Sequence, residues 1–111
     1  MDFNEYQKTA SRTATFEGKV GEYKLMYLCL GLAGESGEVI EKIKHVIRDQ
    51  DGVMSEEKRQ GIKNELGDVL WYLSQLARAC DLSFDDVARA NIEKLADRHK
   101  RGVIKSEGDS R

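Results

Sequence analysis

The chain has 111 residues, of which 40% are hydrophobic and 34% are charged, and its formal net charge is −2. This composition is typical of a globular protein and argues against a general nucleic-acid or acidic-membrane binder, which would need a basic surface. We expect one domain over residues 1–111, with a polar tail over residues 102–111.

Helical periodicity dominates the first half of the chain, and strand signals are weak. The pattern predicts a first helix over residues 2–15 and a long second helix over residues 22–48. Cys29 and Cys80 lie in apolar helical patterns, so we expect buried, reduced thiols, as in a cytosolic protein. The N-terminus has no secretory signal pattern, and no apolar run reaches the ~18 residues that would span a membrane.

The second half is predicted to form a third helix over residues 55–80 and a fourth over residues 83–101. Turn and capping residues mark these boundaries, namely Asp51-Gly52, Ser55, Ser83 and Gly102. Because the loop between the two long helices is short, they should pack antiparallel. The expected fold is therefore all-α, a four-helix bundle-like protomer that oligomerises through helix packing.

Four carboxylates stand beside the apolar stripes of the two long helices. An α-helix turns about 100° per residue. On the second predicted helix, the apolar stripe therefore lies roughly 20° to 80° from Glu35 and consists of Leu28, Leu32, Val39, Ile43 and Val46. Glu38 lies at about −60° from Glu35. The apolar stripe of the third predicted helix lies at the same angles, roughly 20° to 80° from Glu65. It consists of Ile62, Val69, Leu73 and Leu76. Asp68 lies at about −60° from Glu65, as Glu38 does from Glu35. Packing the two stripes together should bring both acidic pairs to a common site at the edge of the core.

Converging carboxylates need compensation, because close like charges raise their pKa values or attract a cation. Hard oxygen ligands select Mg²⁺, Mn²⁺ or Ca²⁺, and Mg²⁺ is usually shared with substrate phosphates. Five glycines near the acids indicate close helix approach or room for a ligand: Gly31, Gly34, Gly37, Gly61 and Gly67. Either acidic motif alone would suit an ordinary solvated helix surface, and the matched placement of the two favours a functional site.

Further candidate residues lie on the third and fourth predicted helices. Asn91, Lys94 and Arg98 form one stripe that could hold phosphate oxygens, although a solvated basic face is the simpler interpretation of their spacing. Tyr72 shares the carboxylate face of its helix and could touch a sugar or base. Trp71 is expected to point away from the site, toward the core or an interface.

The stretches GLAGESGEVIEKIKH and NELGDVLWYL resemble the MazG-like nucleotide pyrophosphohydrolases, a family of the all-α NTP pyrophosphatase superfamily. The family signature, ExxE followed after a spacer by ExxD, is matched by Glu35 and Glu38, then Glu65 and Asp68. The segment NIEKLADRHKRG also resembles the family's C-terminal segment. The resemblance covers roughly residues 3 to 111.

The resemblance implies hydrolysis of a (deoxy)nucleoside triphosphate to the monophosphate and pyrophosphate, in the service of nucleotide-pool housecleaning. The four acids would be the catalytic ligands of Mg²⁺, with Mn²⁺ as a substitute, while Asn91, Lys94, Arg98 and Tyr72 would bind substrate. The alternatives are a related dUTP or phosphoribosyl-ATP pyrophosphohydrolase, or a non-catalytic helical oligomerisation module. The expected partners are the nucleotide and further copies of the chain, as a homodimer or homotetramer, with no nucleic acid or membrane, in the cytoplasm.

Overall fold

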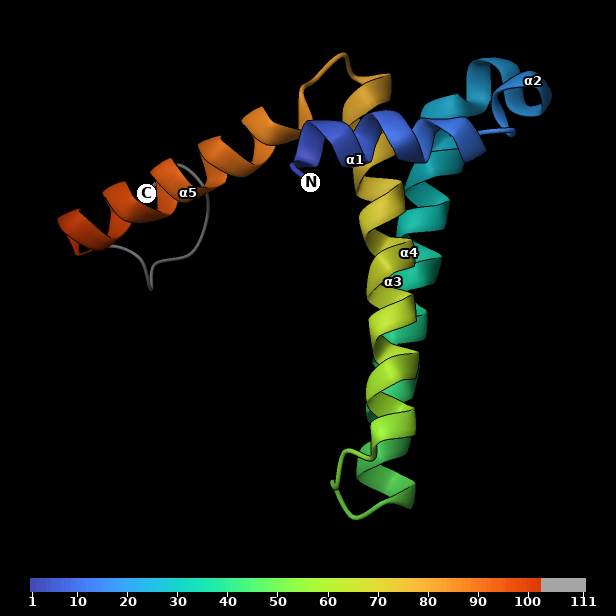
Figure 1. Ribbon diagram of the computed structural model, residues 1–111, viewed down its shortest axis with the longest axis vertical. Coiled ribbons are helices and arrows are strands. Elements are labelled where there is room, and N and C mark those ends of the chain that lie inside the picture. The colour runs from blue at the N-terminus through green and yellow to red at the C-terminus, as the bar shows by residue number, and fades with distance from the viewer. Residues whose placement is uncertain (103–111) are drawn as a thin grey trace.

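The structure, a computed structural model, describes residues 1–102, so the predicted polar tail lies outside the described residues apart from Gly102. All regular secondary structure in this part of the chain is helical, which confirms the all-α prediction (Figure 1). None of the helices in residues 1–102 combines the length and the apolar character that crossing a membrane requires.

The N-terminal helix α1 (Phe3–Ala10) is shorter than predicted. Its side-chain cap is Asp2, whose carboxylate accepts a hydrogen bond from the Glu5 backbone at 2.7 Å. A single 3-10 turn follows, η1 (Ser11–Thr13). The hydroxyls of Ser11 and Thr13 donate to backbone carbonyls three residues earlier, at 2.6 and 2.8 Å. Such local bonds compete with the α-helical pattern, and the helix ends here.

Two short elements that the sequence did not predict lead into the second long helix. They are α2 (Glu17–Val20) and the 3-10 turn η2 (Gly21–Tyr23). Gly21 has a positive φ of 52°, which breaks the helical path between α2 and η2. The long helix therefore begins at Lys24 instead of residue 22.

The helices α3 (Lys24–Asp49) and α4 (Glu56–Ala79) form a long antiparallel hairpin, as predicted (Figure 1). The turn between them uses positive φ angles at Asp51 (52°) and Gly52 (76°). Ser55 then caps α4 by accepting a hydrogen bond from the Lys58 backbone at 3.1 Å. The apolar stripe of α3 faces α4, with Leu28 fully buried.

The N-terminal elements lie across the open end of this hairpin (Figure 1). The side-chain amide of Gln7 donates to the carbonyl oxygens of Ser74 and Leu82, both at 3.1 Å. Trp71 of α4 in turn donates its indole N–H to the N-terminal segment. These bonds fix α1 and η1 against the C-terminal part of α4.

The last helix, α5 (Phe84–Arg101), is held at its start and then leads away from the hairpin (Figure 1). Asp85 accepts a hydrogen bond from the Phe3 backbone at 2.9 Å, and the buried Phe84 ring packs edge-on against the Phe3 ring. Ser83 caps the helix and Gly102 ends it in the left-handed conformation, both as predicted.

The buried core of the described residues is small, with five apolar side chains: Phe16, Leu28, Val46, Ala77 and Phe84. The radius of gyration is 16.9 Å, against about 13 Å for a compact domain of this length. The accessible surface is 8110 Å², against about 6200 Å² for a compact monomer of this mass.

Cys29 and Cys80 are free, but both are exposed, so the prediction of buried thiols is wrong.

Gly31 provides a test of the hairpin contact. A Cβ at Gly31 would lie 2.1 Å from Cε1 of the Tyr72 ring, whereas a Cβ at Gly34 would meet nothing within 4 Å. Gly31→Ala should therefore lower the free energy of unfolding by about 1–3 kcal/mol through overpacking. Gly34→Ala should raise it by up to about 1 kcal/mol through helix propensity. Urea unfolding of both variants measures the difference, and equal stabilities would contradict the packing described here.

Candidate functional site

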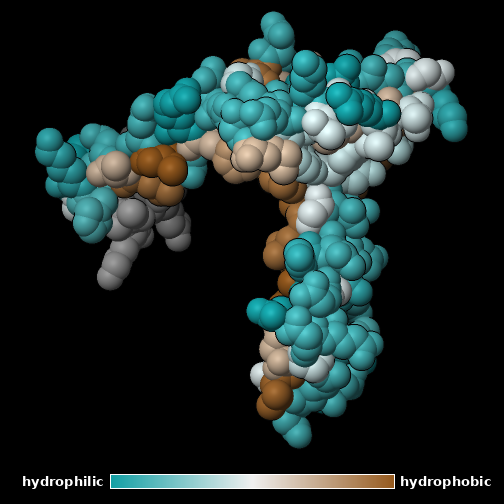
Figure 2. All heavy atoms as spheres, in the orientation of Figure 1, coloured by the Kyte–Doolittle hydropathy of each residue, from teal (hydrophilic) through white to brown (hydrophobic). Residues whose placement is uncertain are grey.

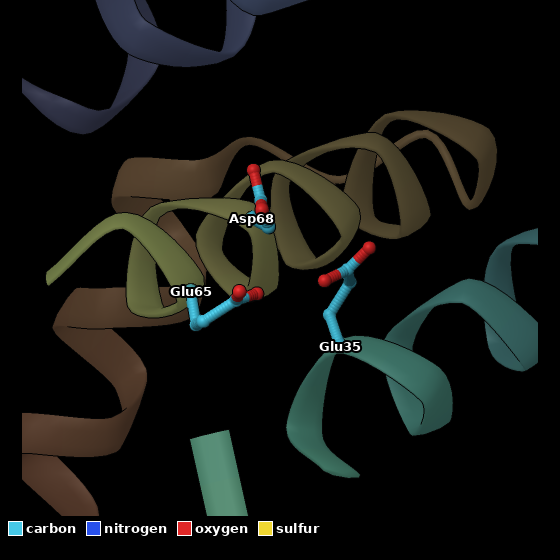
Figure 3. A group of neighbouring side chains, drawn as sticks. All are labelled: Glu35, Glu65 and Asp68. Carbon is cyan, nitrogen blue, oxygen red and sulfur yellow. The ribbon is translucent and has the colours of Figure 1, made fainter. Parts of the chain in front are cut away.

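Three carboxylates meet where α3 and α4 face each other. One oxygen from each of Glu35, Glu65 and Asp68 lies within 4.8 Å of the other two. Figure 3 shows Glu35 reaching from α3 toward the two acids of α4. Glu35 and Glu65 are half-buried and Asp68 is exposed, so the group opens to solvent on one side.

Helix geometry and packing together explain this meeting. Glu35 and Glu65 each stand beside the apolar stripe of their own helix, and Asp68 follows Glu65 by three residues, nearly one turn. Once the stripes pack, the acids at the stripe edges must face each other across the hairpin.

Glu38, the fourth predicted acid, is exposed and lies outside this group of three. Being three residues after Glu35, it is rotated about 60° away from it around α3. Its charge is still close enough to contribute to the electrostatics of Glu35. A role for Glu38 in metal binding stays a prediction.

The pKa of Glu35 is raised above its ordinary value of 4.5. Partial burial is the first cause, because it disfavours the charged carboxylate. The charges of Asp68 and Glu65 raise the pKa further, together with a hydrogen bond to Glu65. Without a cation, folding therefore raises the affinity of Glu35 for a proton.

One basic side chain reaches the group from α3. The ammonium Nζ of Lys42 lies 3.7 Å from Oε1 of Glu65, in an ion pair that bridges the two long helices. The end of the Lys42 side chain lies beside Gly61, where an added Cβ would meet it at 3.6 to 3.8 Å.

An open cavity of about 350 Å³ adjoins the acids and is lined by Thr13, Glu35, Asp68, Trp71 and Tyr72. The expectation that Trp71 points away from the site is wrong. Trp71 follows Asp68 by three residues, a spacing that makes them neighbours on the helix surface and that could have revealed this placement. Thr13 carried no such signal, because only tertiary packing brings η1 to α4.

The aromatic wall of the cavity is held in place from both sides. The Trp71 indole N–H donates to Oγ1 of Thr13 at 2.9 Å and to the Ala10 carbonyl oxygen at 3.2 Å. The Trp71 and Tyr72 rings meet edge to face, with centroids 4.9 Å apart. Burial is the main cause that raises the pKa of Tyr72, followed by its interactions with Tyr27 and with the acids. Tyr72 lines the cavity with Glu35 and Asp68, and its role in substrate binding stays a prediction.

The three predicted residues of the last helix are not brought to the acids within one chain. Asn91, Lys94 and Arg98 lie on α5, which runs away from the middle of the hairpin (Figure 1). Asn91 and Lys94 are exposed, while Arg98 is buried. Their spacing defined a stripe on the helix, but the direction of the helix decides where that stripe lies.

The acidic group has the chemistry and nearly the size of a site for a hard divalent cation. Oxygen ligands on opposite sides of an octahedral Mg²⁺ lie about 4.2 Å apart, twice the usual bond length. Small rotations of the acidic side chains would close the present spacing of up to 4.8 Å. A cation there would also offset the charge repulsion that raises the pKa of Glu35.

Comparison with known proteins finds a family and a relative for this chain. The family model for the MazG nucleotide pyrophosphohydrolase domain matches residues 25–103, which include all four predicted acids. Gene 37 protein of Mycobacterium phage L5 is 43% identical over 115 aligned positions, covering 100% of both chains. No solved structure shows significant similarity to this chain.

The raised pKa of Glu35 predicts an unusual pH dependence in the absence of metal. Between pH 4.5 and the raised pKa of Glu35 in the folded chain, the unfolded chain holds this proton less tightly than the folded chain, so stability should fall as pH rises through this window. One group can contribute at most about 1.4 kcal/mol per pH unit to this slope. Urea unfolding in EDTA at several pH values should show a flatter profile for Glu35→Gln than for the wild type.

Glu41→Gln is the matched control on the same helix. The pKa of Glu41 is lowered by a hydrogen bond and ion pair with Lys44. Removing its charge should therefore slightly lower stability above pH 4.5. If the free energy of unfolding fell more steeply with rising pH in Glu35→Gln than in the wild type, this would contradict the electrostatics described for the site.

Proposed function

The chain belongs to the MazG nucleotide pyrophosphohydrolase family, and we propose that it hydrolyses a (deoxy)nucleoside triphosphate to the monophosphate and pyrophosphate with Mg²⁺. The observation that carries the proposal is the meeting of Glu35, Glu65 and Asp68 at the edge of an open cavity. All three are acids of the family signature. We further propose that the whole chain acts as a single catalytic domain.

Glu35, Glu65 and Asp68 would hold the metal ion, and Glu38 is proposed as a further ligand. When bound, Mg²⁺ or its substitute Mn²⁺ supplies positive charge for the phosphates and lowers the pKa of a water. The carboxylates would orient a water toward the α-phosphorus, and one of them would accept its proton as the bond to pyrophosphate breaks. Pyrophosphate then leaves on the opposite side.

The nucleoside would occupy the cavity beside the acids. A volume of about 350 Å³ falls within the range of small-molecule sites. The rings of Trp71 and Tyr72 offer apolar surface against which a base or sugar can pack. This placement would leave the triphosphate directed toward the carboxylates, where charge compensation is needed.

We also propose a homodimer or homotetramer. A second apolar stripe runs along α3, rotated by roughly 120° from the one that faces α4. Its members are 59 to 66% exposed, namely Met26, Leu30, Ile40 and Ile47. Apolar surface also lies along the hairpin and on α5, facing the open angle between them (Figure 2). A helix that is apolar on two faces needs burial on both.

Assembly would also explain the position of the last helix. Because α5 leads away from the acids of its own chain, we propose that Asn91, Lys94 and Arg98 bind substrate phosphates in a site shared between copies. The proposed setting is the cytoplasm, where nucleoside triphosphates are used, and the proposed role is housecleaning of that pool.

Pyrophosphate release provides the direct test. A panel of NTPs and dNTPs, with dUTP and phosphoribosyl-ATP included, should give metal-dependent release for at least one member and none in EDTA. Glu65→Gln and Asp68→Asn should each lower the rate by about a hundredfold or more, since hard cations bind neutral amides poorly. Asp68→Asn should not lose stability in EDTA, because it removes a repelling charge. Glu65→Gln removes a repelling charge and also the ion pair with Lys42, so its stability in EDTA should change little.

Glu57→Gln, on the exposed first turn of α4, is the control and should retain wild-type activity. Full activity of the Glu65 and Asp68 variants, together with loss of stability in EDTA, would show a structural role for these acids. A chain without activity on any substrate would favour the non-catalytic helical module.

The assembly has its own test by light scattering. A dimer of the 12.6 kDa chain should have a mass of about 25 kDa, twice the chain mass, and a tetramer twice that again. Leu30→Lys with Ile40→Lys places two charges on the outer stripe of α3 and should shift the protein toward the monomer. A wild-type monomer at micromolar concentration would refute the proposed assembly.

A further inference from the structure

The site needs positive charge in both of its states: near the acids when no metal is bound, and near the phosphates when metal and substrate are bound. Without metal, the acidic group is compensated by the ammonium of Lys42, 3.7 Å from Glu65. With metal and substrate, a triphosphate of about four negative charges would face one divalent ion. At least one further cation is then needed near the phosphates.

Lys42 is placed to meet this need from within the same chain. It follows Glu35 by seven residues, so it projects from the same side of α3 two turns further on. Its side chain lies beside Gly61, which precedes Glu65 by four residues on α4. An added Cβ there would already touch Lys42, and a longer side chain would compete for its space. Gly61 thus leaves room for the lysine to cross from α3 to α4.

The pair with Glu65 is loose enough to be exchanged. The Lys42 side chain is 36% exposed and that of Glu65 is 18% exposed. At 3.7 Å the contact is longer than a charge-assisted hydrogen bond, which is usually 2.7 to 2.9 Å. Most other ion pairs in the described residues join neighbours on one helix, such as Lys44 and Glu41. The Lys42 pair is instead formed across the hairpin, at the site.

We propose that Lys42 is a phosphate-binding residue that pairs with Glu65 while the metal site is empty and moves to the nucleotide when a metal ion engages Glu65. The inference rests on the proposed function and adds a residue outside the four-acid signature. Once Glu65 holds a divalent ion, the Lys42 ammonium would lose its partner and be repelled by the ion. The flexible lysine side chain can then turn toward the nearest phosphate without any change in the backbone.

Two binding measurements test this without turnover. Trp71 is the only tryptophan of the chain and lines the cavity with Glu35 and Asp68, so its fluorescence can report on ligands. In a Mn²⁺ titration without nucleotide, Lys42→Met should bind the ion about threefold or more tightly than the wild type, because a competing cation has been removed. In a titration with inorganic pyrophosphate at saturating Mg²⁺, the same variant should bind about tenfold more weakly.

Two further variants complete the design. Lys42→Arg should restore most of the pyrophosphate affinity, since it keeps the charge. Lys44→Met, two residues along the same helix and paired with Glu41, should match the wild type in both titrations. On an active enzyme, Lys42→Met should raise KM for the triphosphate about tenfold or more, with a smaller effect on kcat.

Opposite changes in metal and pyrophosphate affinity are the signature of the exchange. Weaker metal binding with unchanged pyrophosphate binding would assign Lys42 a structural role and overturn the proposal. Unchanged values in both titrations would show an ordinary surface lysine and overturn it as well. Neither titration needs hydrolysis, so a chain that releases no pyrophosphate would refute the proposed function while leaving Lys42 testable.

Discussion

The packing of α3 against α4 is the contact on which the rest of the structure depends. It joins two apolar stripes whose edges carry the acids, so the register of the hairpin sets the distance between Glu35 and Glu65. The contact of Gly31 with the Tyr72 ring fixes this register near the site, because a larger residue would collide with the ring. A slip by one turn would separate the carboxylates by about 5.4 Å along the helix axis.

This register brings negative charges together at a cost in stability. Partial burial and the neighbouring acids raise the pKa of Glu35, and the small core leaves little stabilisation elsewhere. A ligand that binds only the folded state shifts the folding equilibrium in its favour. Metal binding and burial of the outer apolar surfaces would therefore both stabilise a protomer that is not compact on its own.

The N-terminal segment adds a second layer to the site. Trp71 is held by Thr13 and Ala10, so the wall of the cavity depends on residues that lie far away in the sequence. The family match begins at residue 25, after this segment. The acids thus lie within the part of the chain that the family shares, whereas Thr13, which lines the cavity, lies outside the matched region.

The sequence by itself determined the helical fold, the antiparallel hairpin, the caps at Ser55, Ser83 and Gly102, and the meeting of acids from α3 and α4. These follow from local periodicity and from the angular position of each acid beside an apolar stripe. Only the tertiary structure decided that Trp71 lines the cavity, that Glu38 stands outside the group of three and that α5 leads away from the site. Helical spacing gives the side of a helix on which a residue lies, but not what that side faces, because packing between segments distant in sequence sets the direction of each helix.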